Sequence, residues 1–105
     1  HGGGNNTMGY GIAKAGVETL TKGMAREGAR YNILVNAIAP GLINTRFHSE
    51  RLGRTLSEIK KRAKLSKLKR LGQPEEIAAI IDCLISNDVN YMTGEVISVS
   101  GGDWI

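Results

Sequence analysis

Two short apolar runs, about sixty residues apart, constrain the fold of this chain more than any other feature. The first is Ile-Leu-Val at residues 33–35; the pattern allows an extension through 36–39, and Pro-Gly at 40–41 ends it. The second covers residues 95–99. Runs this short and apolar are typical of buried parallel strands, and parallel strands need a long crossover, usually helical. The sequence therefore predicts one right-handed βαβ crossover.

A helical pattern precedes the first run. Over residues 10–27 the apolar side chains recur at steps of four, three and four, which places them on one helix face: Ala13, Val17, Leu20 and Met24. Thr7 is expected to cap the start of this helix and Gly28 to end it.

Two more helices are expected between the strands. Thr55 and Glu58 form a capping box, and the helix that they open is expected to carry apolar positions as far as Leu68. Pro74 is suited to the first position of the next helix, whose apolar stripe consists of Ile77, Ile80, Ile81, Leu84 and Ile85. Cys83 on that helix is expected to be a small core residue. The predicted order is helix, strand, helix, helix, strand.

Composition excludes several classes of protein. The 105 residues allow one modest domain, and 41% hydrophobic with 23% charged residues is ordinary for a globular protein. No apolar run approaches the roughly 18 residues of a membrane span, so no membrane partner is expected. A single cysteine excludes an internal disulfide and a thiolate zinc site, and no metal is expected. A cytoplasmic location fits this cysteine usage best.

Basic residues are concentrated in one segment. Residues 46–70 hold ten lysines and arginines against two acids, about +8, whereas the rest holds four against eight, about −4. The segment lacks interleaved aromatic residues apart from Phe47, so no nucleic-acid partner is expected. Two interpretations remain: the solvated face of an amphipathic helix, or a surface that attracts an acidic substrate carrier or a phosphorylated acyl group.

The most specific motif is Tyr10-x-x-x-Lys14. At this spacing both side chains lie on one helix face, and the ammonium favours the phenolate, which lowers the tyrosine pKa from about 10. A general acid/base for a carbonyl/alcohol pair requires such a shift. Alone, the motif occurs by chance in many helices, so its context decides its weight.

That context is a series of further motifs in a fixed order. After Tyr10 and Lys14 come Asn-Ala-Ile-Ala-Pro-Gly at 36–41, Leu-Gly-Gln-Pro-Glu-Glu-Ile-Ala at 71–78, Tyr-Met-Thr-Gly at 91–94 and Ser-Gly-Gly at 100–102. From about Met8 onward, the series closely resembles the short-chain dehydrogenase/reductase family, especially its oxoacyl-carrier-protein-reductase-like members. The resemblance implies an α/β fold: part of a Rossmann-like, doubly wound parallel sheet, here its last two strands with flanking helices.

The resemblance also implies an NAD(P)-dependent oxidoreductase that transfers hydride between the nicotinamide and a carbonyl or secondary alcohol. Tyr10 matches the catalytic acid/base, and Lys14 its electrostatic partner, which also holds the nicotinamide ribose. The cofactor would be NAD or NADP. The substrate would be a small carbonyl or alcohol compound, including acyl-carrier-linked ones, and the enzyme a homo-oligomer.

Further positions carry over beside the nicotinamide. Pro40 and Gly41 resemble the turn next to the ring, and Ile43 and Thr45 match positions that bind the carboxamide through backbone and side chain. Residues 42–70 would form the substrate-binding lid within a chain, 1–105, that is the C-terminal part of one NAD(P)-binding domain.

Some parts of the family pattern are not present in the sequence. The catalytic serine would fall ahead of His1, and the active-site asparagine, from the helix before that of Tyr10, is missing too. No glycine-rich phosphate turn follows a strand here. The alternative hypothesis is therefore a catalytically inactive fragment or assembly module that lacks the cofactor-binding half.

Overall fold

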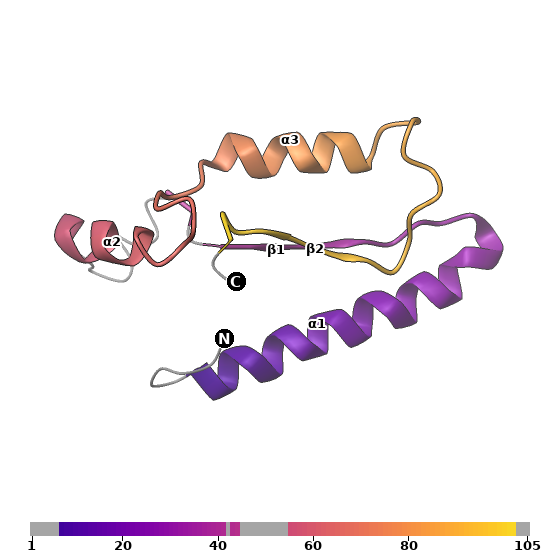
Figure 1. The fold of residues 1–105 in the computed structure, drawn as a ribbon. Coiled ribbons are helices and arrows are strands. Elements are labelled where there is room, and N and C mark those ends of the chain that lie inside the picture. The colour runs from indigo at the N-terminus through magenta and orange to yellow at the C-terminus, as the bar shows by residue number, and fades with distance from the viewer. Residues whose placement is uncertain (1–6, 42, 45–54, 103–105) are drawn as a thin grey trace. The chain divides into compact units, whose positions relative to one another are not determined.

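The computed structural model describes residues 7–41, 43–44 and 55–102 (Figure 1). Its elements are helices and strands in the order α1, a 3₁₀ turn η1, β1, α2, α3 and β2. The chain divides into two units: His1–Ile38 with Val89–Ile97, and Ala39–Asp88 with Ser98–Ile105. The predicted order of helices and strands is confirmed.

Strands β1 (Ala37–Pro40) and β2 (Val96–Val99) pair side by side in a two-stranded parallel sheet (Figure 1). The Ala37 N–H donates to Glu95 O and the Gly41 N–H to Val99 O, both at 2.9 Å. Together with the flanking helices, this sheet confirms the predicted partial α/β Rossmann-like fold.

The first strand falls largely in the predicted extension, 36–39, and excludes the apolar run at 33–35. Strand β1 begins only at Ala37. One backbone bond precedes it, from the Gly94 N–H to Val35 O at 2.7 Å, and side chains make the other bonds there. The Val35 N–H donates to Thr93 Oγ1 at 3.0 Å. The Asn36 amide donates to Met92 O and accepts from the Glu95 N–H. The apolar run at 33–35 thus precedes the strand, and the strand consists of the less apolar residues 37–40 that follow it.

Helix α1 (Thr7–Gly28) begins at Thr7, which is its first residue and not the predicted cap. It ends at Gly28 as predicted and passes through η1 (Ala29–Tyr31) to Asn32, which has a φ of 58°. A Cβ on Gly28 would lie 3.1 Å from Ile33 O, so the close return of the chain favours glycine there.

The covered face of α1 differs from its apolar face. Its more buried residues recur at steps of four, three, four and three: Lys14, Glu18, Thr21, Ala25 and Gly28. The Thr21 hydroxyl is satisfied within the helix by Val17 O at 2.7 Å. By contrast, Val17, Leu20 and Met24 are 49%, 61% and 50% exposed. The predicted apolar stripe exists, but in this chain it faces outward.

Helix α2 (Leu56–Ala63) begins as predicted, since Thr55 Oγ1 accepts from the Glu58 N–H at 3.2 Å. It ends at Ala63, so Leu68, expected within it, lies beyond its end. Helix α3 (Pro74–Leu84) has Pro74 at its first position, also as predicted. No helix of the described residues is long and apolar enough to span a membrane.

The core formed by the described residues is small. Among the described residues, the buried hydrophobic side chains are Ala25 and Ala63, and no large side chain is fully buried. Cys83 is exposed, so its prediction as a core residue is wrong. Helix α3 has too little packed against it in this chain to bury its stripe, and Ile81 and Ile85 are exposed.

Candidate functional site

Tyr10 and Lys14 lie one turn apart on α1, as their spacing predicts. Lys14 is half-buried and begins the covered face that continues through Thr21 and Ala25. The cover over this face comes in part from Gly94, since a Cβ at that glycine would lie 3.6 Å from the Ala25 Cβ. The helix therefore presents Lys14 on its inner side, not among the exposed apolar residues.

The other predicted site residues belong to the second unit. Pro40 is the exposed last residue of β1, and Gly41 continues the pairing through its bond to Val99 O. Ile43 forms an isolated parallel bridge with Gly72, just before α3. Thr45 lies outside the described residues, as do residues 42 and 46–54 of the predicted lid, residues 42–70.

The bridge fixes the direction of the Ile43 backbone. The Asn44 N–H donates to Gly72 O at 2.8 Å. In a parallel bridge of this type, the residues that flank the central one direct their peptide groups to the partner. The N–H and C=O of Ile43 therefore face away from Gly72. No backbone hydrogen bond within the described part of the chain engages either group.

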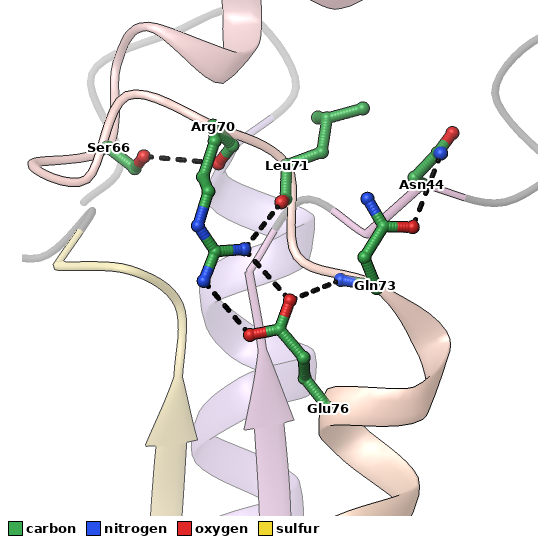
Figure 2. A network of polar contacts seen from close by, with 6 residues as sticks. All are labelled: Asn44, Ser66, Arg70, Leu71, Gln73 and Glu76. Carbon is green, nitrogen blue, oxygen red and sulfur yellow. Dashed lines mark hydrogen bonds and ion pairs between the residues drawn. The ribbon is translucent and has the colours of Figure 1, made fainter.

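A polar network holds the segment that Ile43 and Asn44 contact (Figure 2). Arg70 and Glu76 form a two-pronged ion pair, with Nη1–Oε1 at 2.8 Å and Nη2–Oε2 at 3.0 Å. Arg70 Nη1 also donates to Leu71 O, and the Gln73 N–H donates to Glu76 Oε1 at 3.0 Å. Gln73 Oε1 in turn accepts from Asn44 Nδ2 at 3.4 Å.

The network changes the titration of both charged groups. The Arg70 hydrogen bonds, followed by the one from the Gln73 backbone, lower the pKa of Glu76 from its ordinary 4.5 to about 2. The same contact raises the pKa of Arg70. Glu76 is also in the first turn of α3, where a carboxylate complements the positive end of the helix.

The segment before Arg70 is tied to the turn that follows β2. Ser66 is buried, and its hydroxyl lies 3.1 Å from Ala63 O and 3.4 Å from Arg70 O. The Leu68 N–H donates to Gly101 O at 3.0 Å. Gly101 has a φ of 64°, and a Cβ there would contact Ser66. Residues 66–73 are thus held at both ends within the second unit.

Helix α2 carries a basic surface. Lys60, Lys61 and Lys64 line a shallow pocket of about 520 Å³ together with Leu56 and Ser57. Its lining combines exposed ammonium groups with an exposed leucine. It lies within residues 46–70, where the sequence has its concentration of basic residues.

Comparison with known proteins identifies the fold and the family. The family described as enoyl-(acyl carrier protein) reductase matches residues 1–103. The chain belongs to the short-chain dehydrogenase/reductase family. This membership confirms the resemblance on which the site residues were predicted, whereas their individual roles stay predictions.

Relatives of the short-chain dehydrogenase/reductase family match over most of the chain. The 3-oxoacyl-[acyl-carrier-protein] reductase of Pseudomonas aeruginosa is 43% identical over 95 residues, 89% of this chain and 36% of that protein. Dehydrogenase/reductase SDR family member 4 of Oryctolagus cuniculus is 42% identical over 93 residues, 89% of this chain and 35% of that protein. The chain thus spans about a third of the length of these relatives.

A solved structure of the family is similar in fold. The 4-hydroxyisoleucine dehydrogenase complexed with NADH aligns with a TM-score of 0.77 at 32% identity. The alignment covers 89% of this chain and 38% of that one.

Sequence reasoning missed the contribution of Arg70. In the motif at 71–78 the sequence predicts a helix start at Pro74, and it indicates no partner for Glu76. The pair joins residues six apart across a turn, a spacing that no helix or strand period indicates. The signal available was an arginine two residues before a Gly-x-Pro-Glu-Glu helix start, at the end of a basic segment.

Proposed function

We propose that this chain supplies the catalytic Tyr-Lys pair and the nicotinamide end of an NAD(P)-dependent oxidoreductase acting on a carbonyl or secondary alcohol. The observation that carries the proposal is one helix, α1, with Tyr10 and Lys14 a turn apart in a member of this family. The relative solved with NADH supports the cofactor class, and NAD and NADP both remain open.

The proposed mechanism assigns proton transfer to this chain. When bound, the reduced nicotinamide supplies the hydride. The Tyr10 hydroxyl gives its proton to the substrate oxygen in reduction and takes one in oxidation. The Lys14 ammonium would favour the phenolate form of Tyr10, and it would also bind the nicotinamide ribose hydroxyls.

The second unit would bind the nicotinamide carboxamide. The Ile43 N–H and C=O face away from Gly72, so one donor and one acceptor fit the two polar atoms of a primary amide. Thr45 would add a side-chain contact, and Pro40 and Gly41 would lie beside the ring. Residues 42–70 are proposed as the substrate-binding lid of this single domain.

Two partners follow from surface features. The lysines of α2 favour a substrate with phosphate or carboxylate groups, such as an acyl-carrier-linked compound, and a relative is a 3-oxoacyl-[acyl-carrier-protein] reductase. The exposed apolar stripe of α1 favours assembly with another copy.

The single cysteine favours a reducing compartment such as the cytoplasm.

A second candidate function is a non-catalytic assembly module. The specific observation in its favour is the small number of buried hydrophobic side chains beside many exposed large ones. A chain of this kind gains most of its stability from what covers it, whether or not it performs chemistry.

Substitution of Tyr10 tests the proposal in the complete protein encoded with this chain. Tyr10→Phe removes the proton donor and almost no contact area, so kcat should fall by about 10²–10⁴-fold while NAD(P)H affinity stays unchanged. Lys14→Ala should lower both. The measurements are NAD(P)H oxidation with a panel of carbonyl substrates and fluorescence titration of the cofactor. A Tyr10→Phe variant with most of its kcat would exclude the catalytic assignment and favour the assembly module.

A further inference from the structure

We propose that Arg70 and Glu76 are positioning residues of the cofactor site, which orient the Ile43 backbone toward the nicotinamide carboxamide. The inference rests on the proposed function, because it concerns how the residues assigned there are held. Neither side chain is assigned a contact with the cofactor. Their proposed effect passes through Gly72 and Gln73.

The contacts form a continuous path from the ion pair to Asn44, the residue next to Ile43 (Figure 2). Glu76 receives both guanidinium prongs of Arg70 and the Gln73 N–H. Arg70 also holds Leu71 O, so the peptide on either side of Gly72 is restrained. Gly72 O then accepts from the Asn44 N–H, and Gln73 Oε1 from the Asn44 side chain.

Ile43 depends on this path for its direction. It is an isolated bridge beyond the end of β1, and among the described residues the Asn44 N–H to Gly72 O bond is the backbone bond that fixes it. A rotation of the Gly72 carbonyl would release Asn44 and turn the Ile43 N–H and C=O. The two-pronged pair opposes such a rotation, because two parallel bonds fix orientation as well as distance.

The exposure of the pair favours a positional role over a stabilising one. The Arg70 and Glu76 side chains are 53% and 43% exposed. Exposed ion pairs contribute little to the free energy of unfolding, because water and salt screen them. Geometry, in contrast, is retained at the surface when the bonds are two-pronged and the backbone joins them. A variant should therefore affect binding geometry more than melting temperature.

The test uses the complete protein encoded with this chain, with NADH and NADPH as probes. In Glu76→Gln, which loses the charge but nearly keeps the shape, the Kd for the bound cofactor should rise about tenfold. Its KM for the cofactor should rise in parallel, with kcat and the cofactor-free melting temperature nearly unchanged. Arg70→Lys keeps the charge without the fork and should give an intermediate rise. Glu75→Gln is the matched control, because Glu75 makes no ion pair with any described residue, and its Kd should not change.

Each outcome decides the matter. A Kd within twofold of wild type in both Glu76→Gln and Arg70→Lys would overturn the positioning role while leaving the proposed function intact. A lower melting temperature with an equal loss of kcat would reduce the pair to a structural contact and overturn it as well. Wild-type protein that binds neither NADH nor NADPH would refute the proposed function and this inference together. A selective rise in Kd, absent from Glu75→Gln, is the result that supports it.

Discussion

Helix α1 and the segment from Ser66 to Glu76 satisfy their side chains in opposite ways. In the segment, the hydroxyl of Ser66, the guanidinium of Arg70 and the carboxylate of Glu76 all bond to groups at most six residues away. Along α1, the large apolar side chains are exposed, and the covered face consists of small and polar residues. The segment from 66 to 76 contains the hydrogen-bonding partners of its own polar side chains, whereas the apolar side chains of α1 need other elements to bury them.

The difference shows which interactions a chain of this length can complete. Hydrogen bonds and ion pairs are satisfied by a few near neighbours, and a turn supplies them. Burial of an apolar stripe needs a continuous surface from other elements. The polar site geometry is therefore in place in the second unit, while the apolar face of α1 remains available.

The largest expected effect follows from that available face. The 105-residue chain should associate in solution, and Leu20→Ser should weaken the association, because a buried leucine contributes about 1.5–3 kcal/mol. This corresponds to a rise in the dissociation constant of about tenfold or more. Light scattering coupled to gel filtration gives the average mass.

Leu65→Ser is the control, since Leu65 is 73% exposed but lies outside α1. That variant should associate like wild type. A wild-type chain that is a compact, cooperatively melting monomer would contradict the statement that the apolar face of α1 needs a partner to cover it.

A smaller effect is expected from the polar segment. Ser66→Ala removes a buried hydroxyl that serves two carbonyl groups, and it should lower the free energy of unfolding by about 1 kcal/mol. Ser86→Ala is the matched control, because Ser86 makes the same kind of bond to a carbonyl three residues earlier, Cys83 O at 2.8 Å, and that bond is exposed. Urea unfolding of the complete protein measures both. Equal decreases in the free energy of unfolding for the two variants would mean that burial of the Ser66 hydroxyl adds no stability.

Sequence reasoning succeeded where short-range chemistry decides the outcome. The start of α2 at Thr55 and of α3 at Pro74 follow from caps that act within one turn. The end of α1 at Gly28 follows from one residue. The order of elements and the pairing of two parallel strands also follow, because a long crossover permits few other arrangements.

It failed where residues far apart in the sequence decide. The first strand is shifted to Ala37, and before it the Thr93 and Asn36 side chains make most of the bonds to residues 92–95. The covered face of α1 was not predicted, because Thr21 and Ala25 give no hydrophobic signal. Of the candidate site, α1 carries Tyr10 and Lys14 at the predicted spacing, and Ile43 lies where its bridge with Gly72 directs it. Their roles stay predictions, and Thr45 lies outside the described residues.

The smallest expected effect is a pH dependence of the Arg70–Glu76 pair. The pKa of Glu76 is about 2 in the folded chain against an ordinary 4.5, so folding favours the charged carboxylate. The contribution of the pair should be fully present above pH 4.5 and be lost as the pH falls toward 2. Because both side chains are exposed, the effect should be slight.

Acid unfolding of wild type and Glu76→Gln, followed by circular dichroism, measures this effect. The two should differ above pH 4.5 and converge near pH 2. Parallel curves over the whole range would show that Glu76 is not held in its charged form by folding.

The bonds around Asn36 have a consequence for how cooperatively the strands pair. The hydrogen bonds from Val35 and Asn36 to residues 92–95 join positions 56 to 59 residues apart in the sequence. Whichever bond forms first must therefore close a chain loop of nearly this full length. The entropy of closure rises only with the logarithm of loop length and is met once. After it, each further bond between 35–41 and 93–99 adds stability at little entropic cost. The two strands should therefore pair or separate cooperatively, with the Asn36 side-chain hydrogen bonds at one end of the paired region.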